Sequence, residues 1–132
     1  MIHYDTLASA KQAGAAPWDD QIGQAFHTVI FRDRYPVTPG HLLFVPRYNN
    51  NEGIKQAFSL ALSEGQQMVL RNECEAFNIG INCGAAAGQT VMYPHVHLIP
   101  RRTGDCADPV GGVRGVIAGQ ANYKQPGYQK PA

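Results

Sequence analysis

Stretches of apolar residues along the chain predict four β-strands and one principal helix. The segments 26–31 and 42–45 are rich in aromatic and β-branched side chains, which are typical of strands. Residues 78–82 alternate between apolar and polar side chains, and 95–99 forms a further strand-like run before Pro100. We therefore expect strands at these four segments, with the last one ending at the proline.

The helical pattern lies between the second and third of these strands. Apolar residues recur at helical spacing up to Phe77, and the segment 63–66 (Ser-Glu-Gly-Gln) can form a capping box, so the pattern predicts a helix over 64–77. A weaker helical turn or two is expected over 54–62. The order strand, strand, helix, strand, strand, with short connections, favours an α+β fold with an antiparallel sheet over a parallel doubly wound one.

The length and charge of the chain limit its organisation and its partners. Its 132 residues fit a single domain, with a core over about 22–104 and a glycine-rich extended tail over about 105–132 that could hold a short strand. The formal net charge of +1 gives no broad basic surface, so neither a nucleic acid nor a membrane is an expected partner. Any bound anion must then be held by local geometry.

Cysteine usage and hydropathy favour a reducing cytoplasm. The segment 1–18 lacks the basic and apolar regions of a signal peptide, and no apolar run approaches the ~20 residues of a membrane-spanning helix. The three cysteines, Cys74, Cys83 and Cys106, include no C-x-x-C pair. This pattern argues against a disulfide framework and against a cysteine-based zinc site.

Two histidines on one predicted strand carry the strongest chemical signal. His95 and His97 are two positions apart, and side chains alternate along a strand, so both imidazoles are expected on one face. The glycine-rich segment 83–89 precedes them and can bring backbone N–H groups close to an anion, while Arg101 and Arg102 follow with positive charge. The pattern indicates a phosphate site beside a nucleophile or base.

Two other interpretations of the histidine pair stay open. Both residues could be ordinary half-buried side chains, and His-x-His is also a common metal-ligand pair. No third histidine, cysteine or carboxylate follows at a useful spacing, so we rank a metal site well below a phosphate site and expect no metal.

Two separated segments resemble the histidine-triad (HIT) family of hydrolases. The segment 87–101 (Ala-Gly-Gln-Thr-Val-Met-Tyr-Pro-His-Val-His-Leu-Ile-Pro-Arg) is similar to the family signature, and 35–46 (Tyr-Pro-Val-Thr-Pro-Gly-His-Leu-Leu-Phe-Val-Pro) is similar to its upstream element. The likeness covers roughly 26–104. The segment 101–105 further resembles the branch of the family that cleaves dinucleoside polyphosphates. The resemblance as a whole implies a HIT-like fold.

The resemblance also implies roles for individual residues. His95 matches the nucleophilic histidine and His97 the last histidine, which hydrogen-bonds the phosphate, while Asp33 matches the side chain that binds the ribose hydroxyls. Tyr93 stands where the family has its first histidine, and we expect it to support the other two if it faces the site. Asn49 also replaces a histidine that often follows the upstream element. The remaining residues implied by the match are catalytic Gln89 and substrate-binding Asn82, Gly88, Thr90 and Val91.

The implied activity is that of a HIT-type phosphoric anhydride hydrolase. It would cleave a dinucleoside polyphosphate or a similar nucleotidyl conjugate at the α-phosphate, through a nucleotidyl-histidine intermediate, with no cofactor required and as a homodimer. A catalytically weak nucleotide-binding module is the alternative, because the first histidine is missing. A His-x-His metalloenzyme is a third hypothesis.

Overall fold

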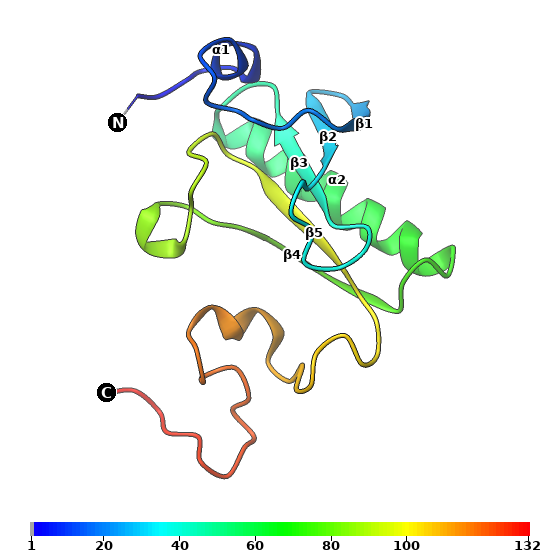
Figure 1. Ribbon diagram of the computed structural model, residues 1–132, viewed down its shortest axis with the longest axis vertical. Helices are drawn as coiled ribbons and strands as arrows, with labels where there is room; N and C mark the ends of the chain where they lie inside the picture. The colour runs from blue at the N-terminus through cyan, green and yellow to red at the C-terminus, as the bar shows by residue number, and fades with distance from the viewer. Residues whose placement is uncertain (1) are drawn as a thin grey trace.

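The computed structural model describes residues 2–132, and its centre is a five-stranded antiparallel sheet covered on one face by a long helix, α2 (Figure 1). The strand order is β1-β2-β3-β5-β4. The predicted fold class, an α+β fold with one main helix, is confirmed. The elements are α1 (Leu7–Gln12), β1 (Gln21–Ala25), β2 (Thr28–Arg32), β3 (Leu42–Pro46), α2 (Asn51–Leu70), β4 (Ala76–Ile81), β5 (Val96–Arg101) and the 3₁₀ helices η1 (Ala85–Ala87) and η2 (Gly112–Val116).

The helix differs from its prediction at both ends. A single helix, α2, replaces the two predicted over 54–62 and 64–77, and it ends at Leu70. Asn50 caps it, because its side chain accepts a hydrogen bond from Gly53 N at 2.8 Å. The segment 63–66 therefore lies inside the helix and forms no capping box there. The helix stops at a left-handed turn, where Asn72 has a φ of 60°.

Strand boundaries shift for local reasons. The first predicted strand starts at Thr28, because Phe26 takes a φ of 52° in the turn that joins β2 to the unpredicted strand β1. The last strand continues past Pro100, contrary to the prediction that it ends there. Pro100 lacks an N–H for a second partner strand, and it needs none, because the pairing of β5 with β3 extends only to Leu98. At Pro100 the strand is paired with β4 alone, opposite Phe77.

Two apolar clusters lie on the two faces of the sheet. One packs α2 against the sheet, with Phe44, Val96 and Leu98 facing the helix. The other lies under α1 and the segment that follows it, and it includes Trp18 and Tyr93. No helix among residues 2–132 combines the length and the apolar character needed to cross a membrane.

The tail folds back on itself without forming a strand. Residues 105–132 contain η2 and no β-strand, so the expected short strand is wrong. The guanidinium of Arg114 lies over the rings of Tyr123 and Tyr128, at 5.1 and 5.8 Å from their centroids, and donates to Ala121 O at 3.1 Å. These contacts hold the tail in the arrangement that Figure 1 shows in orange and red.

Candidate active site

The side chain of His95 is held in one orientation by the backbone. Its Nδ1 lies 2.8 Å from Tyr93 O, and a carbonyl oxygen can only accept, so Nδ1 carries the proton. Nε2 is then the unprotonated nitrogen left for other partners. The ring packs against Trp18, with centroids 4.8 Å apart, and only 8% of the residue is exposed. This burial lowers the pKa of His95 and keeps the imidazole neutral at pH 7.

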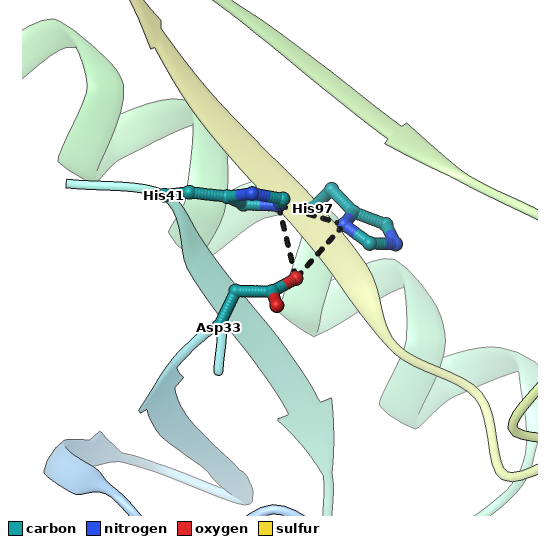
Figure 2. A group of neighbouring side chains, drawn as sticks. All are labelled: Asp33, His41 and His97. Atoms are coloured by element: carbon teal, nitrogen blue, oxygen red, sulfur yellow. Dashed lines mark hydrogen bonds and ion pairs between the residues drawn. The ribbon is translucent and has the colours of Figure 1, made fainter. Parts of the chain in front are cut away.

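His97 is oriented by another histidine, His41, which was not among the predicted site residues. His41 Nε2 lies 2.9 Å from His97 Nδ1, and a dashed line joins the two rings in Figure 2. His41 Nδ1 accepts the backbone N–H of Val37 at 3.1 Å, so the proton of the neutral His41 ring is on Nε2. His41 therefore donates to His97 Nδ1, which places the proton of His97 on its Nε2. This relay makes His97 a hydrogen-bond donor toward other partners.

Asp33 completes this group of side chains. Its Oδ2 lies 3.4 Å from His41 Nε2 and 4.0 Å from His97 Nδ1, and its Oδ1 accepts the N–H of Tyr35 at 2.8 Å. Burial, followed by the nearby imidazoles, lowers the pKa of His97 to about 4. Burial also lowers the pKa of His41. The imidazoles of His41, His95 and His97 are therefore uncharged at neutral pH.

The same three side chains are the group within residues 2–132 that could hold a metal ion. One ligand atom from each of Asp33, His41 and His97 lies within 4.8 Å of the others. A metal at His41 Nε2 would have to displace the proton that the hydrogen bond from Val37 keeps there. The local hydrogen bonds thus favour a proton over a metal ion between the two histidines.

A cavity of about 730 Å³ brings most of the predicted site residues together. It is bordered by Trp18 and by the ends of β2 and β5, on the sheet face opposite α2. The predicted residues that line it are Asp33, Asn82, Gly88, Thr90, Val91, His95 and His97.

The charged side chains at the cavity mouth are paired with each other. Arg32 lies 3.3 Å from Asp20, and Arg34 lies 2.9 Å from Asp19. With Asp33, the lining has more carboxylates than guanidinium groups. A bound phosphate would therefore depend on N–H donors more than on free cations.

Two predicted residues have their side chains elsewhere. The Gln89 amide donates to Val91 O and Met92 O at 3.1 and 3.0 Å and accepts from Gly84 N at 2.7 Å, so it braces the loop and does not line the cavity. The Tyr93 hydroxyl is buried and donates to Pro46 O at 2.6 Å. The hydroxyl thus contacts neither histidine, and Tyr93 supports His95 through its backbone carbonyl instead.

The two arginines expected to add charge at the phosphate are also used elsewhere. Arg101 donates to Asp105 at 2.8 and 2.9 Å and to Asn78 at 2.8 Å, and Arg102 donates to Pro39 O at 3.0 Å. Neither lines the cavity. Their contacts join the end of β5 to β4 and to neighbouring loops, so the expectation that they extend the phosphate site is wrong.

Comparison with known proteins supports the resemblance seen in the sequence. An asymmetrical bis(5'-nucleosyl)-tetraphosphatase of Schizosaccharomyces pombe is 34% identical over 92 residues, which are 61% of this chain and 48% of that protein. An AP-4-A phosphorylase of Mycobacterium tuberculosis is 34% identical over 79 residues, 54% of this chain and 40% of that protein. The chain thus spans about half or less of the length of these two relatives.

Solved structures and a family model agree with these matches. A Zn-bound histidine triad family protein from Mycobacterium smegmatis is 27% identical, with a TM-score of 0.64 over 78% of this chain and 79% of that one. A HIT family protein from Bacillus subtilis is also 27% identical, with a TM-score of 0.59 over 77% of each chain. The HIT domain model matches residues 18–104, and the chain belongs to this family.

Proposed function

We propose that the protein is a nucleotidyl hydrolase or transferase that cleaves a dinucleoside polyphosphate or a similar nucleotidyl conjugate at the α-phosphate. The observation that carries this proposal is the orientation of His95, whose Nδ1 is bonded to Tyr93 O and whose side chain lines the cavity. A neutral imidazole with its Nε2 lone pair free is a competent nucleophile at pH 7. The names of the two curated relatives described above support the same substrate class.

The first step forms a bond between His95 Nε2 and the α-phosphorus while the bond from phosphorus to the leaving group breaks. A polyphosphate leaving group departs as an anion and takes the bonding electron pair. The imidazole becomes cationic, because it keeps the proton on Nδ1, and the carbonyl of Tyr93 at 2.8 Å stabilises that charge. Water then attacks the phosphorus, His95 leaves, and the water releases one proton.

His97 assists both steps as a hydrogen-bond donor. The relay from Val37 N–H through His41 keeps the proton of His97 on Nε2. This N–H can bond a non-bridging phosphate oxygen, on which charge increases in the transition state. In this mechanism His41 acts through His97 and is a positioning residue.

The nucleotide side of the cavity is assigned to Asp33. Its carboxylate lines the cavity and accepts one N–H from Tyr35, which leaves lone pairs available for ribose hydroxyls. No step of this proposed mechanism uses a metal or an organic cofactor.

We also propose that the protein assembles as a homodimer.

A catalytically weak nucleotide-binding module is the second candidate. It is favoured by Tyr93, which stands at the position of the family's first histidine and whose hydroxyl is bonded to Pro46 O instead of facing the other two histidines.

One assay separates the two candidates. Purified protein is incubated with diadenosine triphosphate and excess chelator, and AMP is measured by chromatography. We expect the wild type to release AMP. His95→Ala should release AMP at least a thousandfold more slowly, because losing a nucleophile usually costs about 4 kcal/mol of transition-state stabilisation. The control His27→Ala changes an exposed histidine outside the cavity and should keep the wild-type rate. Binding without turnover would support the module, and activity only after metal is restored would support a metalloenzyme. Mass spectrometry of acid-quenched protein should detect one nucleotidyl group on His95.

A further inference from the structure

A second cavity adjoins the candidate active site. Its volume is about 560 Å³, and it lies between the N-terminal segment and the loop that leads to the histidines. Pro17, Thr90 and Val91 line both cavities, so the two share a wall. Asp33, which is assigned to the ribose of the reacting nucleotide, lines only the active-site cavity, so we assign the shared wall to the leaving group.

The lining of the second cavity is mainly apolar. Its lining includes Tyr4, Ala15 and Met92, and none of its lining residues is a lysine, arginine, aspartate or glutamate. The Asn49 amide is already used, since it donates to Tyr4 O at 2.9 Å. His3 is paired with Asp5, at 3.1 Å from the carboxylate. A polyphosphate would find no lysine or arginine in this lining, whereas an aromatic ring would find apolar surface and the ring of Tyr4.

We propose that this second cavity is a leaving-group subsite that takes the uncharged aromatic end of the departing group, such as the nucleoside of a released nucleotide. The inference rests on the proposed function, because it assumes that a nucleotidyl conjugate is split at His95. It goes further in assigning separate roles to the two cavities: the reacting nucleotide occupies the one that contains the histidines, and the ring of the leaving group occupies the other.

The test compares two substrates that differ at the end of the leaving group. ATP and diadenosine triphosphate carry the same reacting adenylyl group, but only the second has an adenosine on its leaving group. We expect the wild type to prefer diadenosine triphosphate by about tenfold in kcat/KM, the factor that corresponds to about 1.4 kcal/mol of apolar contact. Tyr4→Ala should remove most of that preference by lowering kcat/KM for diadenosine triphosphate more than for ATP.

Two further variants guard this result. Met92→Lys changes a residue that is 36% exposed, so it should fold even if Tyr4→Ala does not, and it should also lower the preference. Tyr123→Ala removes an exposed tail tyrosine that lines neither cavity and should leave both rates unchanged. Equal kcat/KM values for the two substrates in the wild type, or a preference that survives both Tyr4→Ala and Met92→Lys, would overturn the subsite while AMP release still supports the proposed function.

Absence of turnover would refute the proposed function and leave the subsite testable by binding. Trp18 is the only tryptophan of the chain and packs against His95, so its fluorescence reports occupancy of the site. Diadenosine triphosphate should bind about tenfold more tightly than AMP, and Tyr4→Ala should remove the difference. Equal affinities for the two nucleotides would overturn the subsite.

Discussion

Replacing His41 tests the relay that orients His97. In His41→Phe the ring volume is largely kept, but the donor to His97 Nδ1 and the acceptor for Val37 N–H are both lost. Nothing then fixes the proton of His97 on Nε2. The residue is only 4% exposed, so water replaces these hydrogen bonds poorly.

The size of the effect follows from how His41 acts. Removing a donor that touches the transition state costs about 10² to 10³ in kcat. His41 acts one hydrogen bond away from the substrate, so we expect a smaller loss of about 10- to 100-fold, or about 1.4 to 2.8 kcal/mol. KM should change little, because the interaction is strongest in the transition state. His41→Gln keeps an N–H donor and should recover part of the rate.

The assay combines kinetics with a direct observation of the proton. Steady-state rates of AMP release give kcat and KM for the wild type, His41→Phe and His41→Gln, with His97→Ala as the largest loss expected. Nitrogen-15 NMR of the imidazoles should show the Nε2–H tautomer of His97 in the wild type and a mixture in His41→Phe. A His41→Phe enzyme within about twofold of the wild-type kcat, or a wild-type His97 protonated on Nδ1, would refute the relay.

Four other predictions follow from particular contacts. Tyr93→Phe removes a buried hydrogen bond to the end of β3, so it should lower the free energy of unfolding by about 1 kcal/mol in denaturant titrations and leave kcat nearly unchanged; a large fall in kcat would return the hydroxyl to the site. Asp33→Ala should raise KM more than it lowers kcat, and an unchanged KM would remove the carboxylate from nucleotide binding. Gly65→Ala should destabilise the fold by about 1–3 kcal/mol, because its Cβ would lie 2.6 Å from an aromatic ring of β4, whereas Gly80→Ala has open space and serves as the control. The folded-state pKa of His97 is lowered to about 4, so between pH 6.5 and 4 the unfolded chain binds a proton that the folded chain does not. The Tm should therefore fall as the pH drops from about 6.5 toward 4, and it should fall by less in His97→Asn; equal losses in both proteins would contradict this assignment.

The strands could be predicted because their side chains are dominated by apolar and β-branched residues. The segment 42–45 is buried at every position and lies in the observed β3. β1 escaped prediction because Ile22 is its one large apolar residue, and strand pairing with β2 is what holds it. The helix was misplaced because Ser63 offers a capping pattern that competes with Asn50, and local sequence does not rank them. Tertiary packing decides where the helix begins, since Gly65 lies inside α2 and packs against the ring of Phe77 in β4.

The site was only partly predictable for a related reason. His95 and His97 share a face through the two-residue period of a strand, which is a local property. The contact of His97 with His41 depends on the register of β3 and β5, in which Leu43 is opposite His97. His41 lies two residues before Leu43, yet no pattern in the sequence states that register. The same holds for Trp18, which reaches His95 only after the N-terminal segment packs on the sheet.

The replacement of the family's first histidine by Tyr93 is compatible with the proposed chemistry, because the backbone orients His95 and His41 orients His97. Tyr93 contributes its carbonyl to His95, and a carbonyl is available from any residue at that position. His41 contributes the donor to His97, and its own proton is placed by the N–H of Val37. Burial keeps all three imidazoles neutral, so one can act as a nucleophile while another donates a hydrogen bond. The role of position 93 is therefore to place a carbonyl and fill the core, and a tyrosine anchored to the end of β3 can do both.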